Sequence, residues 1–153
     1  MNNFKYAFSL IELIFVIVII GILSVVVTTQ YGGIINEAKF SQAKATISSV
    51  RAAIIMHRRG NIIKGDPSYP AILDDASYNS EQESLFDGNG TIEMLQYPIY
   101  SKIKAGKWMK IAENQYHYRV SDSSAKDLVF DYNSSTGKFD CDHSDSDCQK
   151  LTQ

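Results

Sequence analysis

The feature that most constrains this chain is an apolar run of about 20 residues near its start, from Phe8 to Val27. As an α-helix, such a run spans about 30 Å, which is the thickness of the hydrocarbon core of a bilayer. The run contains one charged residue, Glu12. A carboxylate within a membrane segment costs about 2.5–3.5 kcal/mol on insertion scales, and less near the interface. We therefore expect a membrane-spanning helix in which another group offsets the charge of Glu12.

A short polar leader, residues 1–7, precedes the run and contains one cation, Lys5. If the chain is cut after Ala7, Phe8 becomes the new N-terminus and carries a positive amine. That amine would lie about one helical turn from Glu12. In an assembly, the amine of one subunit could neutralise the Glu12 carboxylate of a neighbour, which a lone helix could not arrange as well.

The junction reads KYAFSLIEL over residues 5–13. This segment resembles the processing site of the type IV pilin and type II secretion pseudopilin superfamily. In that family a prepilin peptidase removes a short leader, the new N-terminal Phe is methylated, and the fifth mature residue is Glu. The resemblance implies cleavage between Ala7 and Phe8, with Phe8 and Glu12 as assembly residues. The chain departs from the family at Ala7, where Gly is usual, and has no proline near the end of the apolar run.

The resemblance also implies a location. Residues 8–29 would form the transmembrane and filament-core half of a helix in the bacterial inner membrane. Lys5 gives a modest positive-inside signal for a cytoplasmic N-terminus, because Glu37 and Lys39 after the run nearly cancel. The C-terminal domain would be periplasmic, and assembly would place it in a periplasmic or surface filament. A cleaved secretory signal is the alternative, although its apolar core is normally about 7–15 residues long.

The helical period continues after the apolar run, through residues 30–59. Apolar residues recur there at spacings of four, three and four positions: Ala43, Ile47, Val50 and Ile54. Lys44 and Arg51 fall on another face, so this half of the helix is amphipathic and should pack on a globular domain. Arg59 and the following Gly60 predict the helix end, because cations and a glycine favour a C-terminus.

Gly32 and Gly33 are the weak point of this long helix. Each glycine costs about 1 kcal/mol relative to alanine, so the chain could form two helices with a break there. The other interpretation is one helix from Phe8 to Arg59. The glycine pair would then be a hinge that lets the anchor reorient as subunits leave the membrane. We predict the single helix with this hinge.

Residues 60–153 should form the periplasmic globular domain. Its first part, up to Lys110, contains all three prolines of the chain and a turn cluster at 87–90. Short helical turns are expected at 85–86 and 92–95. Long irregular connections tend to carry partner-specific surface, although a loop that only covers a sheet is the simpler interpretation.

Three β-strands are predicted after this connection, at residues 115–120, 127–132 and 138–141, where β-forming residues are frequent. The turn segments between them are short, which implies an antiparallel meander. A long N-terminal helix packed on a small antiparallel sheet is an α+β fold. This arrangement also resembles the pilin fold, in which the first half of the helix is transmembrane.

Cys141 and Cys148 enclose six residues close to the C-terminus. Outside the cytoplasm a disulfide between them is the expected state, and it would restrain the unfolded chain by about 2–3 kcal/mol. It would hold a tail that is too polar to pack by itself. The resemblance agrees, because pilins often close their C-terminal region with such a bond. A metal site formed by Cys141, His143 and Cys148 is the alternative, with three ligands in view.

Four aspartates crowd the same loop: Asp140, Asp142, Asp145 and Asp147. Closely spaced oxygen ligands suit calcium, and major pseudopilins have a C-terminal calcium site. The loop does not match an EF-hand, and a solvated acidic loop is the other interpretation. We therefore predict no cofactor and keep calcium as an alternative.

Residues 102–110 mix four lysines with Trp108, and single-stranded nucleic acids are often held by aromatic rings beside cations. In a chain of net charge −2, such lysines more often form a solvated face, so we do not expect nucleic acid as a partner. Asn89 and Asn133 each begin an N-x-[ST] triplet with an aspartate two positions before. Whether either is glycosylated depends on the host and stays open.

No catalytic motif accompanies these features. His57, His117 and His143 are scattered, and the sequence contains no G-x-S-x-G, H-E-x-x-H or Gly-rich phosphate loop. We predict that the protein is not an enzyme.

These observations predict a pilin-like structural subunit, specifically a pseudopilin of a type II secretion system. Prepilin peptidase would process it, and it would polymerise through its N-terminal helix with copies of itself or with other pilin-like subunits. The alternatives are a minor pilin of a type IV pilus or DNA-uptake filament, and an unpolymerised, membrane-anchored periplasmic binding protein.

Overall fold

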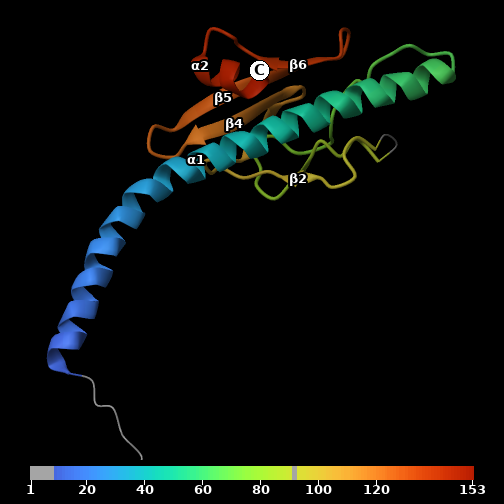
Figure 1. The fold of residues 1–153 in the computed structure, drawn as a ribbon. Helices are drawn as coiled ribbons and strands as arrows, with labels where there is room; N and C mark the ends of the chain where they lie inside the picture. Colours follow the sequence, from blue (N-terminus) through green and yellow to red (C-terminus); the bar gives the residue numbers. More distant parts are fainter. Residues whose placement is uncertain (1–8, 91–92) are drawn as a thin grey trace, which may run out of the picture. The chain divides into compact units, whose positions relative to one another are not determined.

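The structure is a computed structural model that describes residues 9–90 and 93–153, with the side chains of residues 26–32 left out. The chain divides into two compact units, Met1–Glu37 and Ala38–Gln153. We describe each unit by itself. Figure 1 shows the elements in sequence colours.

One helix, α1 (Leu10–Ile63), contains 54 residues and runs without interruption through both Gly32 and Gly33. The prediction of a single long helix is therefore confirmed, and the helix is not broken at the glycine pair. Whether the pair acts as a hinge stays a prediction.

The predicted end of α1 at Arg59 is wrong, because the helix continues to Ile63. Gly60 is helical, and Gly65 instead has the positive φ, 89°, of a glycine that ends a helix. The Asp66 N–H donates to the Asn61 carbonyl at 3.0 Å, and the Gly65 N–H donates to the Ile62 carbonyl at 3.0 Å. These two bonds form a Schellman motif, which satisfies carbonyls that the helix end would leave unpaired.

A four-stranded antiparallel sheet follows in the order β3-β4-β5-β6. Its strands are β3 (Trp108–Ala112), β4 (Gln115–Ser121), β5 (Lys126–Asn133) and β6 (Lys138–Cys141). The three predicted strands correspond to β4, β5 and β6, so the meander and the α+β fold class are confirmed. β3 was not predicted, because its lysines and Trp108 were interpreted as a basic loop.

The connection between α1 and this sheet contains a small two-stranded sheet, β1 (Ser84–Leu85) paired with β2 (Ile99–Tyr100). The helical turn predicted at 85–86 is therefore wrong. Phe86 has a φ of 59°, and its N–H donates to a side-chain oxygen of Asp74 at 2.9 Å. The turn predicted at 92–95 is also wrong from Glu93 on, since Glu93 pairs with Gly88 as an isolated bridge.

The core of the second unit lies between the amphipathic part of α1 and the inner face of the sheet. The predicted stripe of Ala43, Ile47, Val50 and Ile54 is at most 1% exposed. Aromatic side chains from β3, β5 and β6 meet it: the Trp108 and Phe130 rings are 5.0 Å apart, and the Phe130 and Phe139 rings are 5.4 Å apart. This part of the helix therefore packs on the sheet as the sequence pattern predicted.

The C-terminal tail forms a short helix, α2 (Ser146–Thr152), which corrects the expectation of a tail too polar to pack. The Asp145 side chain caps the helix by accepting the Asp147 N–H at 2.7 Å. Cys148 and Leu151 are buried in the core cluster. One leucine, placed three residues after the buried cysteine, is thus sufficient to anchor the tail.

Candidate functional site

The first candidate site is the apolar part of α1 in the first unit. All described side chains from Leu10 to Val25 are exposed, including Leu10 at 76% and Val25 at 67%. An exposed apolar surface of this length is unusual in a soluble monomer and marks a surface that other molecules or lipid cover. Glu12 is the one charge among these residues.

Glu12 lies in the first turn of α1. Its N–H donates to the Ser9 carbonyl at 3.0 Å, and the Leu13 N–H donates to the same carbonyl at 3.2 Å. Ser9 and Glu12 also have the S-x-x-E spacing of a capping box. Glu12 therefore has two candidate roles, as a cap of its own helix and as a charge partner for a neighbouring amine. Ala7 and Phe8 lie outside the described residues.

The glycine pair lies in the same unit. A Cβ added to Gly33 would meet no described atom within 4 Å. Packing within the described chain therefore does not require a glycine at this position. The hinge assigned to Gly32 and Gly33 remains a prediction that backbone flexibility, and not packing, would explain.

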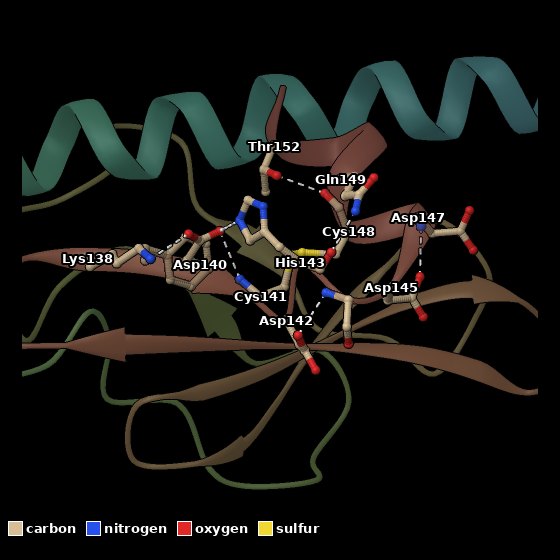
Figure 2. The surroundings of a disulfide bond; sticks show 12 residues. Lys138, Asp140, Cys141, Asp142, His143, Asp145, Asp147, Cys148, Gln149 and Thr152 are labelled. Atoms are coloured by element: carbon tan, nitrogen blue, oxygen red, sulfur yellow. Dashed lines mark hydrogen bonds and ion pairs between the residues drawn. A yellow bond between two sulfur atoms is a disulfide. The ribbon is translucent and has the colours of Figure 1, made fainter.

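The second candidate site is the C-terminal loop, shown in Figure 2. Cys141 at the end of β6 and Cys148 in α2 form a disulfide with their Cα atoms 5.9 Å apart, which confirms the predicted bond. Asp140, His143 and Cys148 offer ligand atoms within 4.8 Å of one another. Because the Cys148 sulfur is part of the disulfide, it is not the thiolate that a metal requires. The alternative of a cysteine-containing metal site does not fit this loop.

Asp140 is the most heavily paired acid of the loop. Its carboxylate contacts Arg51 Nη2 at 3.1 Å, Lys138 Nζ at 3.1 Å and His143 Nε2 at 3.0 Å. Partial burial alone would raise the pKa of Asp140, but hydrogen bonds from Lys138 and His143 outweigh burial and lower this pKa below its ordinary value. The side chain therefore joins α1, β6 and the loop by charge.

Two further loop acids pair with one cation. Lys126 Nζ lies 3.0 Å from an Asp145 oxygen and 2.7 Å from an Asp147 oxygen. Hydrogen bonds from Lys126 are the main cause that lowers the pKa of both carboxyls. The fourth acid, Asp142, accepts the Ser144 N–H at 2.9 Å within the turn. Three of the four predicted calcium ligands thus already have cationic side chains as partners.

The sequence did not predict a buried ion pair in the second unit. Lys110 Nζ lies 2.8 Å from Asp74 Oδ1, and the Asp74 side chain is 0% exposed. Asp74 Oδ2 also accepts the Tyr116 hydroxyl at 2.8 Å and the Phe86 N–H. Burial, followed by the charge of Asp74, raises the pKa of Tyr116 far above its ordinary value. Only a sole lysine within an otherwise apolar strand could have indicated this pair.

This pair and Trp108 correct the interpretation of residues 102–110 as a solvated or nucleic-acid-binding face. Trp108 is 2% exposed, and its ring packs against Tyr118 and Phe130. A ring with both faces in the core is not available to stack on a base. The expectation that nucleic acid is not a partner keeps its support from this geometry.

The two N-x-[ST] triplets lie in turns. Asn133 is exposed at the end of β5, and its side-chain oxygen accepts the N–H groups of Ser135 at 2.9 Å and Thr136 at 3.1 Å. The triplet that begins at Asn89 ends at Thr91, which lies outside the described residues. Glycosylation of either asparagine stays open.

Within residues 9–90 and 93–153, no helix meets the length and hydropathy that crossing a membrane requires.

Comparison with known proteins gives one match. Residues 2–28 of the 153-residue chain match the family of the prokaryotic N-terminal methylation motif, and the match covers the predicted cleavage junction and Glu12. No curated protein and no solved structure matches the chain. Proteins with this motif are structural subunits and not enzymes. The chain carries the prokaryotic N-terminal methylation motif, the signature of type IV pilins and pseudopilins.

Proposed function

We propose that this protein is a structural subunit of a pilus-like filament, cut between Ala7 and Phe8 by prepilin peptidase and polymerised through the apolar part of α1. One observation carries the proposal: the methylation motif coincides with a helical segment, Leu10 to Val25, whose described side chains are all exposed. Burial of these side chains against neighbouring helices is favourable by about 25 cal/mol per Å². The filament core would thus provide the burial that the chain alone does not.

Glu12 would set the register of this assembly. A carboxylate among apolar helices costs several kcal/mol unless an opposite charge pairs with it. The amine of Phe8 in a neighbouring subunit is that charge once the leader has been removed. Subunits would then be stable in the core only at the axial position where this amine reaches Glu12.

The proposal places the N-terminus in the cytoplasm, the apolar segment in the bacterial inner membrane and the second unit in the periplasm. The disulfide between Cys141 and Cys148 supports this placement, because such bonds persist in oxidising compartments and are rare in the cytosol. Assembly would then carry the second unit into a periplasmic or surface filament.

We assign the subunit to a type II secretion pseudopilus, formed with copies of itself or with other pilin-like subunits. The modest chain length and the absence of a proline near the end of the apolar run favour this machine over a type IV pilus or a DNA-uptake filament. We propose neither catalysis nor a required metal, since cations already pair three of the four loop aspartates. Deletion of the gene should therefore stop protein secretion and leave twitching motility and transformation intact.

The maturation step is tested by the intact mass of the protein purified from its own membranes. We expect a chain that begins at N-methylated Phe8 and lies two hydrogen masses below the reduced form. A chain that still begins at Met1 would contradict the proposal and favour a static membrane anchor.

The assembly step is tested with Glu12→Gln. Glutamine retains the capping-box hydrogen bond but removes the charge, so the variant separates the two roles of Glu12. We expect normal processing and membrane insertion but few or misregistered filaments in a sedimentation and electron-microscopy assay. Glu113→Gln, at an exposed position on the β3–β4 turn, is the control. Normal filaments from Glu12→Gln would show that charge pairing does not set the register.

A further inference from the structure

The part of α1 that belongs to the second unit has another apolar surface, directed away from its own core. Its inner stripe ends with buried Ile54, but the next residues, Ile55 and Met56, are exposed, and so are Ile62 and Ile63. Residues seven apart lie on one face of a helix, so the two pairs stack one above the other. Exposed Arg59 lies between them. We call Ile55, Met56, Arg59, Ile62 and Ile63 the outer stripe.

A segment of similar pattern lies earlier in the chain, in the first unit. Ile34 and Ile35 are exposed at 65% and 49%, and the exposed acid Glu37 follows two positions later. This segment has the charge opposite to that of the outer stripe. Both contain an adjacent pair of large apolar side chains, followed within a turn by the charged residue.

The spacing between the two segments defines how two copies can fit together. Ile34 and Ile35 precede Ile55 and Met56 by 21 residues, which is three heptads. If two parallel helices are staggered by this amount, the two apolar pairs lie at the same level. Glu37 then lies next to the level of Arg59, where its charge can pair with the guanidinium. One displacement therefore satisfies both the apolar and the charged contacts.

We propose that the outer stripe binds residues 34–37 of a second copy of this chain, with the two helices parallel and staggered by 21 residues. This inference rests on the proposed function and deepens it, because it names a second contact between subunits besides the apolar segment from Leu10 to Val25. Each such contact displaces one subunit by about 32 Å along the helix axis relative to the other.

The contact is tested in cells that assemble the full-length chain, with two differently tagged copies expressed together. One copy carries Ile35→Cys and the other carries Met56→Cys, and the membranes are oxidised and run on a non-reducing gel. The native cysteines do not compete, because Cys141 and Cys148 are bonded to each other. A disulfide requires Cα atoms about 4.4–6.8 Å apart, so a mixed dimer of the two tags reports the proposed level.

The register control pairs Ile35→Cys with Ser49→Cys. Ser49 is exposed and lies one heptad before Met56 on the same face, so its cross-link would report a stagger of 14 residues. We expect the mixed dimer with Met56→Cys and none with Ser49→Cys. Adding Glu37→Arg to the first copy should abolish the dimer, and adding Arg59→Glu to the second copy should restore it.

Sedimentation of filaments from the unmodified chain separates the two ways in which this inference can fail. If filaments form but the Met56→Cys pair gives no more mixed dimer than the Ser49→Cys pair, the contact is wrong and the proposed function stands. If the unmodified chain forms no filaments, the proposed function fails and the contact fails with it.

Discussion

Residues 10–25 and residues 43–54 belong to one helix, α1, yet their apolar side chains have opposite environments. All described side chains from Leu10 to Val25 are exposed, whereas Ile47, Val50 and Ile54 are buried against the sheet. Removing apolar surface from water contributes about 25 cal/mol per Å². The second segment thus stabilises its own chain, while the first can gain this energy only from lipid or from another molecule. Continuity of secondary structure does not imply a common source of stability.

The two regions also treat charge differently. In the second unit, buried Asp74 has a cation and two further donors of its own chain within hydrogen-bonding distance. In the first unit, Glu12 lies among exposed apolar side chains. A unit that pairs its charges internally should be sensitive to changes of either partner. A segment that depends on other molecules should show its defects in assembly.

The largest expected effect comes from breaking the internal charge pair with Lys110→Met. The variant leaves the Asp74 carboxylate buried without its cation, which typically costs about 3–5 kcal/mol of unfolding free energy. Denaturant unfolding of the full chain in detergent, followed by Trp108 fluorescence, measures this loss. The double variant Lys110→Met with Asp74→Asn removes both charges and should recover part of the stability. A single variant as stable as the parent would refute the view that the second unit depends on internal pairing.

A matched pair of large-to-small changes compares the two segments of α1 directly. Ile47→Ala removes a side chain that is 1% exposed and should lower the unfolding free energy of the second unit by about 2–5 kcal/mol. Ile17→Ala, at a position 58% exposed, should leave this unfolding unchanged and reduce filament yield. The same denaturation and sedimentation assays serve both variants. Equal destabilisation by both would mean that the first segment also contributes to the core.

Removal of the disulfide should have a smaller effect, because it acts on the loop that fixes α2. The double variant Cys141→Ala with Cys148→Ala should lose about 2–3 kcal/mol, since the unfolded chain gains the freedom that the bond removes. The parent protein treated with reductant should show the same lowered midpoint. A variant that unfolds at the parental midpoint would show that packing of Leu151 alone holds the tail.

The smallest expected effect concerns the paired surface acids, and it appears at low pH. Partial burial would raise the pKa of Asp140, but hydrogen bonds from Lys138 and His143 lower it below the ordinary 3.8. A carboxyl whose pKa is lowered in the folded state stabilises the protein above pH 3.8, and this contribution is lost as the pH falls through the folded-state pKa. Asp140→Asn should therefore cost at most about 1 kcal/mol at pH 7.

The pH profile provides the control for this last prediction. Thermal unfolding between pH 7 and pH 2 should show a shallower acid decline for Asp140→Asn than for the parent protein. Glu113→Gln, at an exposed turn position, should follow the parental profile. Parallel profiles for all three proteins would mean that Asp140 is not coupled to folding.

Local patterns were sufficient for several parts of the fold. The strands β4, β5 and β6 were predicted because runs of β-forming residues are separated by short polar turns. The disulfide was predicted because two cysteines at this spacing can always meet. In each case the information lies in neighbouring residues, so the sequence alone determines the outcome.

Other parts depended on partners far away in the sequence. Lys110 could be buried in β3 only because Asp74, in a loop 36 residues earlier, supplies the opposite charge. The backbone bend at Phe86, which replaced the predicted helical turn, is held by the same carboxylate.

The sequence by itself determined the motif at the N-terminus, the existence of α1, the cysteine pair and three strands, because each rests on residue type and short-range period. Only the tertiary structure decided that α1 ends at Gly65, that Trp108 and Lys110 lie in the core and that the polar tail forms α2. The physical reason is that burial and charge pairing are properties of contacts, and these contacts join residues that no local pattern connects.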